Sequence, residues 1–271
     1  MKKVLMTGLK IIVFFLAWVM LISMTDTDFS NPVLWRFFAE LIPLVMIVVL
    51  TFLFLKIEKK TVRIPIKDNI GRGMVVGIIV GFLWICVPAC LLFTLKQLLI
   101  TNINEIPYIW IWIVSAFMNV VMQELLVRGY IYQLLKVKHN LSMAVIITTL
   151  LFTLLHGGAI GAGVIPVINV ITMCLFTTVL YESEGTLMAP IFAHAIWNIF
   201  GAIVIGGVNL AEDYPSIMDL SVSVNNIISG GNCKIEGSII VTIMNLMLSA
   251  VFYHKYRKDI AVKNTTEEQI I

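Results

Sequence analysis

Long apolar runs separated by short polar connections dominate the sequence. A membrane-spanning helix needs about 20 mainly apolar residues, and this criterion predicts eight spans. They are Leu9–Met24, Leu34–Leu55, Gly73–Leu95, Pro107–Leu135, Leu141–His156, Gly163–Tyr181, Leu187–Ile205 and Gly237–Tyr253. The pattern therefore predicts an all-α fold, a polytopic transmembrane bundle of about eight helices.

The composition agrees with a membrane protein. Hydrophobic residues make up 59% of the chain and charged residues 13%, whereas a soluble domain has about 45–50% and about 25%. The net charge of +3 comes from short basic clusters beside the apolar runs, and no basic face or tail indicates binding to nucleic acid. We therefore expect contact with membrane lipid and no nucleic-acid partner. The sequence does not indicate an oligomeric state.

The basic clusters also predict the orientation. They fall on one side of the membrane if the spans alternate, which makes that side, with both termini, cytoplasmic. The connection with Glu182 and Glu184 is the exception. The long connection 206–236 lies opposite, is acidic, and is expected to be an irregular external loop, a linker rather than a lid. The tail 260–271 is polar and expected to be disordered. The charges favour a bacterial-type cytoplasmic membrane, and an organellar or endoplasmic membrane is compatible with them as well.

Several strongly polar residues stand inside the apolar runs, where such groups are costly and usually functional. On the fourth span, Glu124 and Arg128 are four residues apart, share a helix face and can form an ion pair, whereas Gln123 points to a different side. For this pair alone, a structural strut explains the pattern as well as a catalytic role does. His194 and Asn198 share a face of the seventh span in the same way, and each alone is more typical of a packed core residue.

A further histidine, His156, is predicted to lie at the same depth in the membrane as these residues. If the fourth and fifth spans form a hairpin that turns near 137–140, Glu124 lies roughly 20 Å before the turn and His156 roughly 24 Å after it, at 1.5 Å per residue. His194 and Asn198 have a comparable depth after the next cytoplasmic turn. We therefore expect polar groups from three helices to converge within the membrane.

Such a set of groups suits hydrolysis of a peptide bond. A carboxylate and a histidine can activate water, and a second histidine with an amide can stabilise the oxyanion. Glu124, His156 and His194 would also suit zinc, which commonly has three protein ligands and a water at catalytic sites. The His-Glu-x-x-His signature is absent, so a zinc site and a metal-free site are both compatible with the sequence.

Three ordered motifs resemble the CAAX prenyl protease type II and bacteriocin-processing family, also called the Abi family. The family signature is Glu-Glu-x-x-x-Arg, then Phe-x-x-x-His, then His-x-x-x-Asn or Asp. Here the motifs are Gln123-Glu124-Leu-Leu-Val-Arg128, Phe152-Thr-Leu-Leu-His156 and His194-Ala-Ile-Trp-Asn198. The flanking Arg-Gly-Tyr, Glu-Gly-Thr-Leu-Met-Ala-Pro and Phe-Ala-His segments match as well, and the resemblance covers about a third of the chain.

The resemblance implies an integral membrane endopeptidase that acts on membrane-associated peptides or protein tails. Its glutamate and first histidine would activate water, while the second histidine and the asparagine would hold the oxyanion, with Gln123 and Arg128 supporting them. It also implies three regions: N-terminal transmembrane helices (1–106), a catalytic core (107–205), and the external loop with the last transmembrane helix and cytoplasmic tail (206–271). The family carries the name metalloprotease, so zinc is a candidate cofactor beside none.

One residue departs from the family signature, and this departure leaves two functions to consider. The first glutamate, the usual base, is Gln123 here, and an amide cannot accept the proton of water at neutral pH. Glu124 can take that role, although its ion pair with Arg128 makes it a weaker base. The sequence therefore favours a protease that works through Glu124. The alternative is a hydrolysis-deficient relative that acts as a bacteriocin immunity or membrane scaffold protein.

Overall fold

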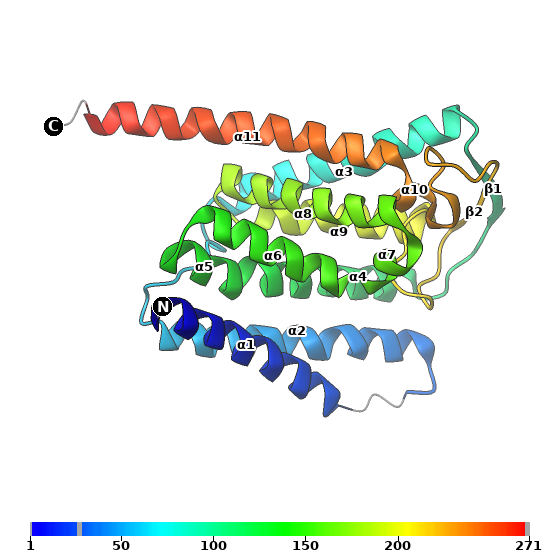
Figure 1. The fold of residues 1–271 in the computed structure, drawn as a ribbon. Coiled ribbons are helices and arrows are strands. Elements are labelled where there is room, and N and C mark those ends of the chain that lie inside the picture. Colours follow the sequence, from blue (N-terminus) through cyan, green and yellow to red (C-terminus); the bar gives the residue numbers. More distant parts are fainter. Residues whose placement is uncertain (1, 26–28, 269–271) are drawn as a thin grey trace. The chain divides into compact units, whose positions relative to one another are not determined.

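The computed structural model describes residues 2–25 and 29–268, which are mostly helical (Figure 1). Each predicted span corresponds to helical structure. Within the described residues, six segments are long and apolar enough to cross a membrane: Lys2–Ser23, Pro32–Ile57, Ile70–Thr94, Ile109–Lys138, Val164–Glu184 and Gly231–Val262. The helices Leu141–Leu155 and Met188–Val204 are apolar but shorter. The predicted fold class is confirmed, and the chain is an integral membrane protein.

The chain forms two compact units, each assembled from three separate stretches of sequence. Unit 1 comprises Met1–Ile64, Ile100–Phe152 and Trp197–Ser221. Unit 2 comprises Pro65–Leu99, Thr153–Ile196 and Val222–Ile271. The three functional regions expected from the sequence, divided at 106/107 and 205/206, stay a prediction.

Unit 1 is built on helices whose ends are specified locally. Its main elements are α1 (Lys2–Ser23), α2 (Pro32–Ile57), α4 (Ile109–Glu124), the π-helical turn η1 (Leu125–Ile131), α5 (Tyr132–Lys138), most of α6 (Leu141–Leu155) and the π-helical turn η2 (Ile199–Val204). The Asn31 side chain caps α2, because its Oδ1 accepts hydrogen bonds from the N–H groups of Val33 (2.9 Å) and Leu34 (3.3 Å). Pro32 follows at the first helical position, where a missing N–H costs nothing.

Glu58, which follows α2, connects three other parts of unit 1. It is only 4% exposed and pairs with Lys10 and with Lys138 (3.5 Å), while the Tyr130 hydroxyl donates to it at 3.3 Å. Burial alone would raise the pKa of Glu58, but the hydrogen bond from Lys10 and the charges of both lysines outweigh burial. The pKa therefore lies below its ordinary value of 4.5.

Unit 2 is centred on two helices that run side by side, α8 (Val164–Glu184) and α11 (Ile239–Glu268) (Figure 1). A buried amide joins them: Asn245 Nδ2 on α11 donates to Thr172 Oγ1 at 2.9 Å and to the Asn169 carbonyl at 3.2 Å, both on α8. Hydrogen bonds of this kind between helices are typical of membrane bundles. The unit also contains α3 (Ile70–Thr94), α7 (Gly157–Ala162), most of α9 (Met188–Asn198), the 3-10 turn η3 (Gly231–Cys233) and α10 (Lys234–Gly237).

Glu184, at the end of α8, explains the exceptional acidic connection noted in the sequence. Its carboxylate, 5% exposed as a residue, pairs with Arg72 at 3.2 Å and with Lys255. The acidic connection therefore receives its positive charge from the start of α3 and from α11. The cytoplasmic placement of this end stays a prediction.

Three glycines at intervals of four residues let α3 approach the segment that carries α9. A Cβ atom at Gly77 would lie 2.5 Å from the Ala189 carbonyl oxygen, and one at Gly81 would lie 2.7 Å from Ile196 Cβ. At Gly73 the nearest atom would be a Thr186 methyl at 2.4 Å. Small residues with this spacing permit close helix contact in membranes, so α3 places α9 and the histidine it carries.

Two expectations were wrong in part. The expected irregular loop contains β2 (Met218–Val222), which pairs with β1 (Leu98–Ile103), and also the short helix α10. The Asn104 N–H donates to the Ile217 carbonyl at 2.7 Å and the Ser223 N–H to the Gln97 carbonyl at 3.1 Å, so the pairing continues for one residue beyond both ends of the strands. The expected disordered tail is helical to Glu268, because extending an existing helix avoids the cost of nucleation. Residues 269–271 lie outside the described residues.

Candidate active site

Glu124 and Arg128 form the ion pair expected from their spacing. Arg128 Nη1 lies 2.6 Å from Glu124 Oε2, and both side chains are 0% exposed. The guanidinium also lies over the ring of Phe152, with 5.7 Å from Cζ to the ring centroid. Because a buried charge is costly unless it is paired, this arrangement maintains a carboxylate inside the membrane protein.

The backbone changes form directly after two of the motif residues. Helix α4 ends at Glu124 and continues as the π-helical turn η1, and α9 ends at Asn198 and continues as the π-helical turn η2. Within η1 the backbone departs from helical values at Gly129, with φ −76° and ψ −118°. Single π-helical turns within α-helices occur frequently at functional sites. The local backbone thus marks both motifs independently of their residue types.

Gln123 points away from the ion pair, as its position on the helix predicts. Its Nε2 donates to Asn119 Oδ1 at 2.6 Å, and Asn119 Nδ2 donates to Glu40 Oε2 at 2.8 Å. Among the described residues, no hydrogen-bond donor reaches Gln123 Oε1, which is buried. The three side chains therefore form a relay that begins at a carboxylate on α2 and ends at an amide oxygen on α4.

Glu40 is the charged end of this relay and is 5% exposed. Its Oε1 accepts from Arg36 Nη1 at 3.0 Å and from the Tyr214 hydroxyl at 3.3 Å. Burial and the negative charge of Glu40 raise the pKa of Tyr214, so this hydroxyl stays protonated and donates. Asn119 donates to the other oxygen, Oε2, so both carboxylate oxygens of Glu40 accept hydrogen bonds.

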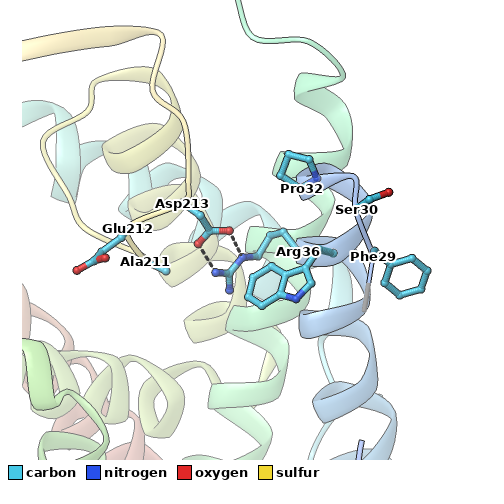
Figure 2. A pocket seen from close by; sticks show the side chains of 8 residues that line it. Phe29, Ser30, Pro32, Arg36, Ala211, Glu212 and Asp213 are labelled. Carbon is cyan, nitrogen blue, oxygen red and sulfur yellow. Dashed lines mark hydrogen bonds and ion pairs between the residues drawn. The ribbon is translucent and has the colours of Figure 1, made fainter. Parts of the chain in front are cut away.

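Arg36 links Glu40 to the 206–236 connection. Figure 2 shows its guanidinium facing the Asp213 carboxylate, with Nε 2.8 Å from Oδ2 and a second contact beside it. The Arg36 guanidinium also lies 5.0 Å from the centroid of the Tyr214 ring. Arg36 and Asp213 border a surface cavity of about 560 Å³ between the start of α2 and residues 211–213. A continuous set of polar contacts therefore runs from this cavity to Gln123.

The remaining predicted site residues lie on α9 and before α7. His194 is 1% exposed and Asn198 5% exposed, whereas His156 is partly buried between α6 and α7. His156 and His194 belong to unit 2, while Gln123, Glu124, Arg128 and Asn198 belong to unit 1. The meeting of these residues at one site stays a prediction.

A metal centre was one interpretation of the sequence. In the part of the chain that the structure describes, no group of three or more His, Cys, Asp or Glu side chains is arranged to hold a metal ion. Glu124 lies in unit 1, whereas His156 and His194 lie in unit 2, so the ligand set proposed from the sequence stays a prediction.

The sequence interpretation missed Arg36, Glu40 and Asn119. The signal was present, because Arg36 and Glu40 are an i,i+4 pair of opposite charges within an apolar span, the same pattern that identified Glu124 and Arg128. It also missed the series Gly73, Gly77 and Gly81, whose four-residue spacing is typical of close helix contact.

Comparison with known proteins identifies part of the chain. Residues 105–200 match the family model described as type II CAAX prenyl endopeptidase Rce1-like. The matched segment contains all three motifs and covers about a third of the sequence. No curated protein and no solved structure matches the chain. The family recognised from the motifs is confirmed for this segment.

Proposed function

We propose that the chain is an intramembrane endopeptidase that cleaves membrane-associated peptides or protein tails with activated water. Its class is that of the type II CAAX prenyl proteases. The observation that carries the proposal is the family match over residues 105–200, which includes every motif residue. The buried Glu124–Arg128 pair supports it, because a charge kept inside a membrane protein usually serves function.

In this proposal each polar residue has one task. Glu124 and His156 together take a proton from water, which then attacks the peptide carbonyl carbon. His194 and Asn198 donate hydrogen bonds to the oxyanion that forms, and Asn198 is held between the end of α9 and the turn η2. Arg128 pairs with Glu124 and orients its carboxylate. The proton taken from water is then available for the leaving amine.

A second function is favoured by one specific observation, the amide at position 123. Gln123 cannot accept a proton, and its Nε2 is already engaged with Asn119. A family member that binds peptides or membrane partners without hydrolysis, as an immunity or scaffold protein would, needs no base there. The retention of Glu124, His156, His194 and Asn198 favours the protease.

The test is hydrolysis of a quenched fluorescent peptide by the purified protein in lipid vesicles. We expect turnover by the wild type and at least about a 100-fold loss in Glu124→Ala and in His156→Ala, as removal of a general base typically causes. His254→Ala is the matched control, because His254 is an exposed histidine on α11 outside the motifs. No turnover by the wild type, with activity gained in Gln123→Glu, would dispose of the protease and leave the binding function.

Two further arms of the same assay address the metal and the substrate. Loss of turnover after dialysis against a chelator, with recovery on adding zinc, would assign the activation of water to a metal. Unchanged turnover would assign it to the side chains named above. Peptides of one sequence with and without a prenylated cysteine show whether the lipid group is recognised.

A further inference from the structure

The relay from Glu40 through Asn119 to Gln123 has a direction, and its charged end determines that direction. Glu40 accepts hydrogen bonds from Arg36 and Tyr214 on Oε1, so as a carboxylate it can only accept on Oε2 as well. Asn119 must therefore turn its Nδ2 toward Glu40 and its Oδ1 toward Gln123. Gln123 must then donate its Nε2 to Asn119, so its Oε1 is the atom that takes no part in the relay.

We propose that Glu40, acting through Asn119, is a positioning residue that requires an amide at position 123 and turns the carbonyl oxygen of that amide away from Asn119. The oxygen is buried and has no donor within the described residues. A buried acceptor without a donor destabilises the folded state, so a donor from outside the chain, either a bound water or a substrate N–H, would complete its hydrogen bonding. The direction of the relay does not depend on the proposed function, whereas this use of the oxygen rests on it.

The relay also predicts that a glutamate does not fit position 123 in this chain. In Gln123→Glu, two carboxylates would face the two ends of a single Asn119 side chain, and only one of them could receive Nδ2. The other would face Oδ1, an acceptor against an acceptor. The glutamate of the family signature is therefore incompatible with Glu40 in this chain.

Exchanging the carboxylate and the amide between positions 40 and 123 should restore a donor for every acceptor in the relay. In the double variant Glu40→Gln/Gln123→Glu, Asn119 can flip, donate Nδ2 to the new carboxylate and accept from the new amide on α2. The oxygen of that amide still accepts from Arg36 and Tyr214. Every hydrogen bond of the wild-type relay then has a counterpart of opposite direction.

The experiment is a double-mutant cycle on the midpoint of thermal denaturation in detergent. We expect Gln123→Glu to lower the midpoint by about 4–8 °C, because a buried hydrogen bond to a charged group is lost. In the Glu40→Gln background the same change should lower it by less than about 2 °C. Effects that add within about 2 °C would overturn the proposal, because independent packing losses are additive.

Matched variants keep the result interpretable. Thr51→Val on α2 also changes a buried polar side chain, but Thr51 Oγ1 has no hydrogen-bond partner among the described residues, so combining it with Gln123→Glu should give no rescue. If Gln123→Glu does not fold, Asn119→Asp tests the same point. It places a carboxylate against Glu40, and Glu40→Gln should rescue it; failure of that rescue would overturn the relay.

Peptide hydrolysis by the same proteins is a separate readout. Rescue of the midpoint without hydrolysis by any variant would support the relay and refute the proposed protease. Hydrolysis by the wild type with additive midpoints would refute the relay and support the protease. With both present, the reversed relay should change the pH profile of turnover, because it brings a titratable carboxylate to position 123.

Discussion

Replacing Arg128 by methionine tests whether the buried ion pair is a structural requirement of unit 1. Methionine retains much of the length of the arginine side chain and removes the guanidinium. The change takes away the Nη1 contact to Glu124 at 2.6 Å and the contact with the Phe152 ring. Both charged side chains are 0% exposed, so water does not replace the lost partner.

The expected magnitude follows from the burial of both partners. Removing one member of a buried pair costs about 3–5 kcal/mol, because the other charge is left without its partner. At roughly 2–4 °C per kcal/mol for a chain of this size, the midpoint of thermal denaturation should fall by about 6–20 °C. The double variant Glu124→Leu/Arg128→Met removes both charges and should lie within about 1 kcal/mol of the wild type.

The assay is thermal denaturation of the detergent-solubilised protein, followed by cysteine-reactive dye or by light scattering. Arg257→Met is the matched control, because Arg257 is exposed on α11 and its loss should shift the midpoint by less than about 2 °C. A shift below about 2 °C for Arg128→Met, or a double variant no more stable than the single one, would refute the reasoning. The stable double variant should also be inactive in peptide hydrolysis, which separates the structural role from the chemical one.

Three further predictions concern other parts of the molecule. Gly77→Leu should lower the midpoint of thermal denaturation by several degrees or prevent folding, because a Cβ atom there would lie 2.5 Å from a backbone oxygen of the α9 segment. Gly71→Leu is the control and should be neutral in the same assay, because a Cβ atom at Gly71 would have nothing within 4 Å. Glu58 has a lowered pKa in the folded protein, so its contribution to stability is present above pH 4.5 and is lost as the pH falls through the lowered pKa. When the midpoint of thermal denaturation is measured against pH, Glu58→Gln should therefore reduce the fall of the midpoint on the acid side. An unchanged fall would contradict this. Arg36→Gln should loosen the connection held by Asp213 and speed its cleavage in limited proteolysis, with equal rates for both proteins as the contrary outcome.

The sequence by itself determined the membrane character, the helical segments and the motif positions. Twenty apolar residues in succession have no other stable form in lipid than a helix, because every backbone N–H and C=O must find a partner within the segment. The pairing of Glu124 with Arg128 followed from helix geometry alone, since residues four apart share a face. The family was recognisable because its three motifs are local in sequence.

Only the tertiary structure decided which distant segments satisfy one another. Strands β1 and β2 lie more than 100 residues apart, and neither has a hydrophobic alternation strong enough to predict a sheet. Glu40 and Gln123 were separately visible as polar residues in apolar runs, but the contact through Asn119 depends on how α2 meets α4. The direction of hydrogen bonds in that contact, and therefore the atom that Gln123 presents, is a property of the assembled side chains. A sequence specifies which donors and acceptors exist, and only packing decides which of them face each other.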